Sequence, residues 1–388
     1  MERISLSKAY DRVLAEDVVA PMNVPPFDRS TVDGYAVRAV DTFGADEDRP
    51  IALKFCGQVT VGEFPSIVVE SGMAAEIVTG APLPKGADAV VMVEYSTRRD
   101  DNILIHRPVS KGENIMEAGS DIRKGEKILE KYQTLSSRDI GVLAALGLTE
   151  VYVYKRPKVT ILSTGAEIVE PGKPLPSGKI YDINAYAFSA AVLECGGEPT
   201  NLGIILDEKS QLKAAIKKAL NSADVVITSG GVSVGPTDIV PQVVDALGKP
   251  GVILSGIAVK PGKPTTIAIV NGKPIFSLPG HPTSSLLMFH VIVRPIICKM
   301  AGQTEESPSV LKTVAATKMF PAKGRRTFVM VNLTYDKAGK LTASPVPVGL
   351  SGAITTLARA DGFVEIPEKQ QFIDVGTTIN VYLFSKRL

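Results

Sequence analysis

The chain has few of the side chains that bind transition metals directly. Among its 388 residues there are only three cysteines and three histidines. They are Cys56, Cys195 and Cys298, and His106, His281 and His290. They fit no metal-ligand spacing, so we predict three buried, reduced thiols and no zinc or iron–sulfur site held by the protein. A transition metal handled here is expected to be held by a small-molecule ligand, whereas a magnesium site of carboxylates and waters is compatible with the composition.

The sequence also lacks an excess of charge and long apolar runs. Its formal net charge is +2 and aromatic residues make up 6%, which argues against nucleic-acid binding. No run of about 18 apolar residues is present, so no membrane span is expected. The first residues, MERISLSKAYDRVLAEDV, contain no signal-peptide core, and the expected location is therefore the cytoplasm.

The middle of the chain alternates short apolar runs with segments of helical periodicity. Strands are predicted at 158–163, 199–206, 224–228, 265–270 and 274–278, and helices at 185–195, 210–220, 238–247 and 284–300. Asp182 or Asn184 is suited to cap the first of these helices. This alternation predicts a doubly wound parallel α/β domain over 156–300.

The two ends of the chain have a different character. From 305 to 388, alternating segments between Gly, Pro and Asp turns predict a small antiparallel β-barrel or sandwich, with a weaker helical pattern at 351–359. Strands at 51–61, 72–77 and 87–93 and a helix at 136–146 make the first 155 residues mixed. We expect 1–40 and 121–155 to meet as an elongated N-terminal region, with 41–120 as an inserted β-rich module.

The most specific local signal is TSGGVSVGPTD, Thr228–Asp238. A strand enters a glycine-rich turn before a helix, so converging backbone N–H groups and the helix N-terminus favour an anion. Its candidate ligand residues are Ser229, Gly230, Gly231, Ser233 and Gly235. Asp238 fits equally well as a ligand of a metal ion that bridges to a phosphate and as a plain helix cap. The segment is neither a Rossmann fingerprint nor a Walker loop.

Two further loops carry proline and charge. In VKPGKP, Lys260 and Lys263 lie three residues apart and are suited to an oxyanion, although a solvated basic turn explains them as well. In SLPGHPTS, Pro279 and Pro282 stiffen a loop that opens the next helix. His281, between these prolines, is more simply explained as structural.

Near the N-terminus, PPFDRSTVDGYAVR (25–38) is too polar for a core. It places Asp28, Arg29, Ser30 and Asp33 where they reach a ligand or partner, or form an ion-paired turn. VTGAPLPKGADAVV (78–91) is a similar rigid turn that carries Thr79. Because HExxH is absent and three scattered histidines make a weak case for a catalytic triad, an anion-binding cleft fits the chain better than a hydrolase.

Taken together, these segments resemble the molybdopterin molybdotransferase family, which includes the E domain of gephyrin. The matching stretches, in the family's order from about 25 to 284, are PPFDRSTVDGYAVR, VTGAPLPKGADAVV, GSDIRKGE, STGAEI, IYDIN, GIILDE, TSGGVSVGPTD, VKPGKP and SLPGHPTS. The C-terminal part matches the family's layout more than any sharp motif. The resemblance implies a four-part subunit whose α/β part is similar to the adenylyltransferases, and a homodimer whose cleft is completed by the partner.

The implied reaction inserts molybdate or tungstate into adenylylated molybdopterin and releases AMP, with Mg²⁺. The pterin dithiolene would supply the soft ligands, which agrees with the scarcity of cysteine and histidine. Glycine-rich turns and lysines suit the oxyanions.

The resemblance also implies roles for individual residues. Those carried over by motif are Asp33, Thr79, Asp121, Glu167, Asp207, Asp238, Lys260, Lys263, Pro279 and Pro282. Glu167, Asp207 and Asp238 would place magnesium and pyrophosphate, and the lysines would neutralise molybdate or the pterin phosphate. Asp33 and Thr79 would reach in from the partner subunit, and catalysis would rest on positioning and electrostatics.

The sequence departs from the family pattern at three positions. Ala166 stands where many members have an acidic or polar residue, Gly256 where many have lysine, and His281 where asparagine is common. Two other functions stay open: a molybdopterin-binding scaffold without turnover, and the adenylyltransferase that makes the intermediate. The long N-terminal region disfavours the adenylyltransferase, because stand-alone forms lack it.

Overall fold

The computed structural model describes residues 1–231, 239–304, 310–346 and 354–384. The chain divides into two compact units. The C-terminal unit contains 153–388 together with 1–2 and 11–15, and the N-terminal unit contains 3–10 and 16–152.

The centre of the C-terminal unit is a six-stranded sheet in the order β16-β13-β17-β21-β20-β18. Its strands are β13 (Lys158–Thr164), β16 (Glu198–Ile205), β17 (Val225–Ser229), β18 (Pro250–Ser255), β20 (Thr266–Val270) and β21 (Lys273–Leu278). The first four in spatial order are parallel. β20 is antiparallel to both neighbours, so the sheet is mixed rather than fully parallel as predicted. The cause is a two-residue hairpin between β20 and β21, where Asn271 and Gly272 have φ of 52° and 78°.

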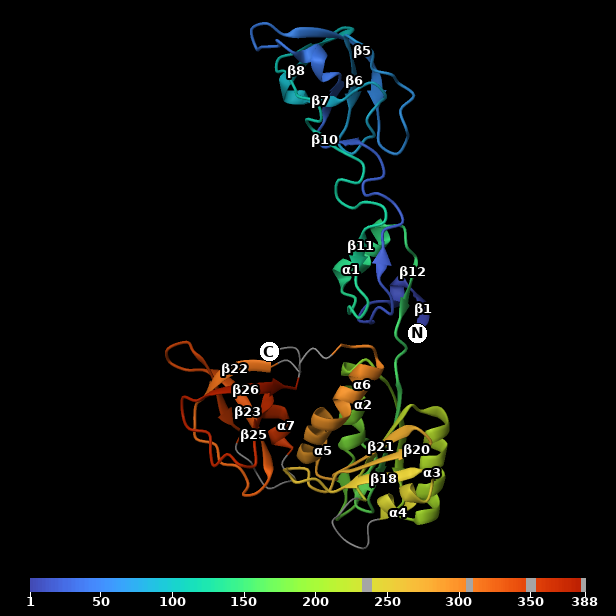
Figure 1. Ribbon diagram of the computed structural model, residues 1–388, viewed down its shortest axis with the longest axis vertical. Coiled ribbons are helices and arrows are strands. Elements are labelled where there is room, and N and C mark those ends of the chain that lie inside the picture. Colours follow the sequence, from blue (N-terminus) through green and yellow to red (C-terminus); the bar gives the residue numbers. More distant parts are fainter. Residues whose placement is uncertain (232–238, 305–309, 347–353, 385–388) are drawn as a thin grey trace. The chain divides into compact units, whose positions relative to one another are not determined.

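Helices cover both faces of this sheet (Figure 1). They are α2 (Asn184–Glu194), α3 (Lys209–Ser222), α4 (Ile239–Asp245), α5 (Pro282–Met288) and α6 (Arg294–Met300). α2, α5 and α6 pack on one face and α3 and α4 on the other. α3 shows why, because it buries Leu212, Ile216 and Ala219 on one helical face and exposes its lysines. The predicted doubly wound α/β domain is confirmed.

The helix predicted at 284–300 has a π-helical middle. A π-turn at Phe289–Val293 separates α5 from α6. By length and composition, the 19 residues of Pro282–Met300 would suffice to cross a membrane. Leu287, Phe289 and Ile297 are nevertheless buried in the core of the α/β domain, which accounts for the apolar composition. His290, within the π-turn, packs against Phe289 and Phe384, and burial lowers its pKa to about 3.

The C-terminal barrel predicted from the alternating segments is confirmed, but it is not fully antiparallel as predicted, because the strands at 310–315 and 341–345 pair in parallel. β22 (Val310–Ala315), β23 (Arg326–Tyr335), β24 (Leu341–Pro345), β25 (Gly362–Ile366) and β26 (Thr378–Leu383) close on themselves through the pairing of β23 with β25. The short helix α7 (Thr355–Arg359) lies within this part. β19 (Val259–Lys260) pairs with β23, and Phe328, Met330 and Phe363 join the core of the α/β domain. The barrel therefore packs directly on the α/β domain.

The N-terminal unit holds a second six-stranded sheet, in the order β7-β4-β6-β5-β9-β8. Its strands are β4 (Gly34–Val37), β5 (Ile51–Val59), β6 (Met73–Ile77), β7 (Ala89–Met92), β8 (Ser96–Arg99) and β9 (Asn102–Ile105). β4 thus belongs to this β-rich sheet although it precedes the predicted boundary at 41.

Three two-stranded pairings join distant segments of the N-terminal part. They are β1 (Glu2–Ser5) with β12 (Glu150–Val153), β2 (Val18–Val19) with β11 (Lys127–Leu129), and β3 (Arg29–Ser30) with β10 (Ile115–Met116). α1 (Ser137–Ala145) begins at a capping box formed by Ser136 and Asp139. The flanks of the β-rich sheet are therefore held together by strand pairs.

The cysteines differ from the prediction of three isolated, buried thiols. Cys56 and Cys298 are half-buried, and Cys195 is buried. The packing of α2 against α6 brings Cys195 and Cys298 together, although they are far apart in the sequence. A hydrogen bond with Cys298, together with burial, raises the pKa of the Cys195 thiol.

Candidate functional site

The predicted site segments meet at a topological switch point. β13 and β17 are neighbours, but the chain leaves β13 through α2 toward β16 and leaves β17 through α4 toward the other edge of the sheet. α2 and α4 lie on opposite faces. At such a point a crevice opens beyond the carboxyl ends of the strands, where open α/β sheets bind ligands.

The turn after β17 can only be made with glycine. Gly230 has φ of 85°, and a Cβ there would lie 2.1 Å from the Thr164 carbonyl oxygen. Gly231 has φ of 66°, and its Cβ would lie 2.7 Å from Val240 Cγ2. The turn is thus closed against β13, as a tight anion-binding turn requires. Ser233, Gly235 and Asp238, also predicted here, lie outside the described residues.

Asn184, at the start of α2, ties this turn to the loop after β21. Its amide donates to Ser229 Oγ at 2.7 Å and to the Gly280 carbonyl at 2.8 Å. The predicted Pro279 is buried, and Pro282 occupies the first turn of α5. These residues shape and brace the crevice. Sequence reasoning considered Asn184 only as a cap, although IYDIN was among the matching motifs.

Two predicted carboxylates lie beside the end of β13. The hydroxyl of Thr164, the last residue of β13, donates to the carboxylate of Asp207, which lies in the loop after β16. Gly165 has φ of 152°, and a Cβ there would lie 2.9 Å from the Glu167 carboxylate oxygens. Both acidic residues are exposed. Thr164 and Gly165, which are consecutive in the chain, therefore position Asp207 and Glu167, respectively. Neither role was predicted from the sequence.

These oxygen donors fit magnesium better than a softer metal. Mg²⁺ is typically held by one or two carboxylates together with waters and substrate phosphates. Within the described ranges, no group of three or more histidine, cysteine or acidic side chains is placed to hold a metal ion. Asp207 and Glu167 suit an ion shared with a phosphate, beside the Thr164 hydroxyl.

The two predicted lysines lie at the end of the sheet where the parallel strands have their carboxyl ends, nearer to β20. Lys260 is in β19, and Lys263 precedes β20. Gly262, with φ of 109°, packs this loop against α5, since a Cβ there would lie 2.5 Å from Met288 Sδ. Both lysines are exposed, and neither ammonium has a hydrogen bond or ion pair within the part of the chain that the structure describes. Two exposed cationic side chains are suited to an oxyanion.

The remaining predicted residues are in the N-terminal unit. The backbone N–H and the hydroxyl of Thr79 both donate to Asp33 Oδ1, at 2.6 and 2.7 Å. These bonds lower the pKa of Asp33, so the carboxylate is ionised at neutral pH. Asp121 is exposed, and its backbone N–H donates to the Val24 carbonyl. The structure thus joins Asp33 to Thr79, while their place opposite a partner subunit stays a prediction.

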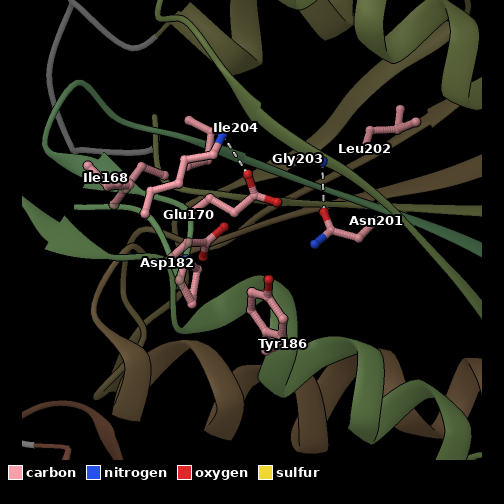
Figure 2. A pocket seen from close by; sticks show the side chains of 11 residues that line it. Ile168, Glu170, Asp182, Tyr186, Asn201, Leu202, Gly203 and Ile204 are labelled. Carbon is pink, nitrogen blue, oxygen red and sulfur yellow. Dashed lines mark hydrogen bonds and ion pairs between the residues drawn. The ribbon is translucent and has the colours of Figure 1, made fainter. Parts of the chain in front are cut away.

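A hollow of about 560 Å³ opens beside the edge strand β16. We call it the β16 hollow, and it is lined by 168–171, Lys173, Asp182, Tyr186 and 201–204. Figure 2 shows the Tyr186 hydroxyl and the Asn201 amide pointing into the space that Glu170 and Asp182 border. Its volume is typical of a small-molecule site. Its walls come from the parallel pair of strands at 168–169 and 180–181, the start of α2 and the edge strand β16. Ile168, Asp182, Gly203 and Ile204 belong to matching motifs, but no motif predicted a hollow.

Comparison with known proteins covers nearly the whole chain. Family models describe 1–147 as the MoeA N-terminal region (domain I and II), 160–299 as a probable molybdopterin binding domain and 312–384 as the MoeA C-terminal region (domain IV). Proteins named molybdopterin molybdenumtransferase are similar throughout. The one from Staphylococcus aureus (strain COL) is 35% identical, covering 98% of this chain and 90% of that protein. The one from Haemophilus influenzae is 34% identical, covering 100% and 95%.

Solved structures agree with this result. The molybdopterin biosynthesis MoeA protein from Pyrococcus horikosii is 43% identical and superposes with a TM-score of 0.88, covering 99% of this chain and 94% of that one. A second MoeA structure, from Pyrococcus horikoshii OT3, is 33% identical with a TM-score of 0.78, covering 98% and 94%. With the arrangement of the switch point, these matches show that the chain belongs to the MoeA family of molybdopterin molybdenumtransferases.

Proposed function

We propose that this protein inserts molybdate or tungstate into adenylylated molybdopterin and releases AMP. The observation that carries the proposal is the row of groups along one edge of the sheet. The turn at Ser229–Gly231, whose two glycines leave no room for a side chain, lies there with two carboxylates beside β13 and two exposed lysines. This order suits a substrate with a pyrophosphate, to which an oxyanion is brought.

In this reading each group has a distinct task. The N–H groups of the turn hold a phosphate, and Asn184 keeps the turn and the β21 loop in register. Lys260 and Lys263 attract the oxyanion and offset its charge. Glu167 and Asp207 would hold Mg²⁺, which supplies charge stabilisation at the phosphoanhydride. Catalysis then rests on positioning and preorganised electrostatics, with no protein nucleophile.

The wider setting belongs to the same proposal. We place the enzyme in the cytoplasm as a homodimer, in which Asp33 and Thr79 of one subunit complete the cleft of the other. The bond that fixes Asp33 against Thr79 keeps an ionised carboxylate on an exposed surface. A pair with a purely structural role would not need to be exposed. The exposure of Asp33 therefore supports a role toward a partner or ligand.

The test is AMP release from adenylylated molybdopterin with Mg²⁺, with and without molybdate or tungstate. Asp207→Asn and Glu167→Gln should each lower the rate by roughly 100-fold or more, because each removes charge from the phosphate site. Glu208→Gln is the matched control, since Glu208 is exposed beside Asp207 and its bond to Gln211 can be kept by a glutamine.

The outcomes separate the candidate functions. Oxyanion-dependent release that is lost in Asp207→Asn and kept in Glu208→Gln supports metal insertion and identifies the preferred metal. Tight substrate binding without release would favour the scaffold function. Release that ignores both oxyanions would contradict the proposal.

A further inference from the structure

Two of the three cysteines meet where the end of α2 packs on α6. Cys195 directly follows the last residue of α2, and Cys298 lies within α6. Cys195 is 2% exposed in the core of the α/β domain, and the half-buried Cys298 packs against the same core. The two side chains are hydrogen-bonded to each other. This pair of thiols lies outside the crevice described above and has no task in the proposed reaction.

The backbones of the two cysteines are held together by Gln303. Its side-chain amide donates to the Cys195 carbonyl at 3.3 Å, and its backbone N–H donates to the Cys298 carbonyl at 2.9 Å. One residue thus fixes both cysteine backbones relative to each other. A disulfide needs such a fixed arrangement, because the sulfurs must approach to about 2.05 Å without a large movement of the backbone.

Two glycines let the end of α2 come close to α6 around the sulfurs. A Cβ at Gly196 would lie 3.4 Å from Ala301 Cβ, and a Cβ at Gly197 would lie 3.2 Å from Ile297 Cγ2. Ile297 and Ala301 stand on either side of Cys298 in the sequence. The contact between the helices is therefore closely packed, and little rearrangement is needed to join the two sulfurs.

The two thiols differ in access and in acidity. The hydrogen bond with Cys298, followed by burial, raises the pKa of the Cys195 thiol, so Cys195 keeps its proton. Cys298 is the more accessible sulfur, and it lies one turn after Arg294 on α6. A guanidinium nearby favours the thiolate, which is the reactive form. A small oxidant is therefore expected to meet Cys298 first.

We propose that Cys195 and Cys298 are an oxidisable pair that a hydroperoxide converts into a disulfide, which fastens α2 to α6. The Cys298 thiolate attacks one peroxide oxygen, and the O–O bond breaks. A sulfenic acid forms on Cys298, and the leaving oxygen takes up the proton that Cys298 had lost. The Cys195 sulfur then attacks the Cys298 sulfur. The S–S bond forms, the S–O bond breaks, and water leaves with the Cys195 proton. The thiols lose two electrons in all, and the peroxide gains them.

The disulfide should stabilise the α/β domain. It would close a loop of about 100 residues, and longer loops gain more stability from closure. For a unit of this size, the Tm should rise by about 10 °C. The pair lies at the opposite end of α2 from Asn184, which braces the crevice, so neither the disulfide nor its test depends on the proposed function.

The test compares the full-length protein after treatment with dithiothreitol and with a small excess of hydrogen peroxide. Free thiols are counted in denaturant, peptides are mapped by mass spectrometry without reduction, and the Tm of each form is measured. The oxidised protein should retain one of its three thiols and yield a linked peptide pair that contains Cys195 and Cys298. Its Tm should be higher by about 10 °C. Dithiothreitol should reverse the rise, which separates a disulfide from methionine oxidation.

The matched control is Cys56→Ala. Cys56 is also half-buried, but it donates to the Ala74 carbonyl in the N-terminal unit, so this variant should keep the full response. Cys298→Ala and Cys195→Ala should abolish it. Peptide mapping of the unsubstituted protein decides the matter even if these variants fail to fold.

Three outcomes would overturn the proposal. The first is that all three thiols stay free in the folded, peroxide-treated protein. The second is that Cys298 proceeds to sulfinic acid without a link to Cys195. The third is a disulfide that leaves the Tm unchanged or lowers it, because the helices would then be strained rather than fastened.

Discussion

Each unit of this protein contains a hydrogen-bonded aspartate–threonine pair made of predicted site residues or their neighbours. The two pairs differ in the number of their hydrogen bonds. In the N-terminal unit, both the N–H and the hydroxyl of Thr79 converge on one oxygen of Asp33. In the C-terminal unit, only the hydroxyl of Thr164 bonds to Asp207. The first arrangement fixes a carboxylate in its ionised form. The second leaves a carboxylate that can turn to a ligand, which fits a group that must share a metal ion with a passing substrate.

The largest effect is expected at the turn after β17 (Ser229–Gly231), where it contacts Thr164 of the C-terminal pair. Gly230→Ala should push the turn away from the Thr164 carbonyl, since its Cβ would lie 2.1 Å from that oxygen. A displacement of this size should lower AMP release by about 100-fold. Gly272→Ala is the control, because Gly272 also has positive φ, of 78°, but its Cβ would meet no atom within 4 Å. That variant should cost about 1 kcal/mol of stability and keep its activity.

The next comparison concerns acid, to which the two units should respond in different pH ranges. Burial lowers the pKa of His290 in the C-terminal unit from 6.5 to about 3. The folded state therefore binds fewer protons than the unfolded state, so stability is full above pH 6.5 and falls as the pH drops toward 3. Between pH 6.5 and 5 the loss should be about 2 kcal/mol. Denaturant unfolding of His290→Phe should lack this loss, and exposed His281→Gln should retain it; equal slopes in all three proteins would contradict the assignment.

Buried threonines offer a smaller contrast between the units. Thr42 in the N-terminal unit donates to the Ala39 carbonyl at 2.7 Å and accepts from the Val109 N–H at 3.1 Å. Thr228 in the C-terminal unit is equally buried, but its hydroxyl has no partner among the described residues. Thr42→Val should destabilise by about 1–3 kcal/mol, whereas Thr228→Val should be neutral or stabilising by about 1 kcal/mol. Urea midpoints measure both, and a larger loss at Thr228 would reveal a ligand or water on that hydroxyl.

The smallest expected effect tests the N-terminal pair itself. Because its folded pKa is lowered, ionised Asp33 contributes stability above its usual value of 3.8, and this is lost as the pH falls through the lowered pKa. Asp33→Asn should remove this acid dependence, which begins near pH 3.8, at the lower end of the range of His290. Calorimetric melting of both proteins between pH 6 and 3 measures it. An unchanged acid profile would mean that the Thr79 bonds do not favour the charged form.

Local sequence patterns predicted most helices and strands of the α/β domain, because each segment has its own hydrophobic periodicity. Lys158–Thr164 and Val225–Ser229 both lie within one residue of their predicted ends. The strand β20 was predicted, but its antiparallel direction was missed, although Asn271–Gly272 between two apolar runs is a hairpin signal. β18 (Pro250–Ser255) was also missed, because its short run lies among glycines and prolines.

The candidate site was likewise predicted only in part. Glu167, Asp207 and Ser229–Gly231 were proposed from motifs, and the structure places them around the end of β13. The bracing by Asn184 and the hollow at β16 were not predicted, since they join segments that share no local pattern.

The sequence by itself determined the family, the order of strands and helices, and the supply of oxyanion-binding groups, because these depend on residue type and spacing along the chain. The tertiary structure decided which of these groups meet. β13 lies between β16 and β17, so the Thr164 hydroxyl reaches Asp207 and the Thr164 carbonyl leaves no room for a side chain at Gly230. Such contacts arise from strand order in space, which long-range packing sets and no local pattern encodes.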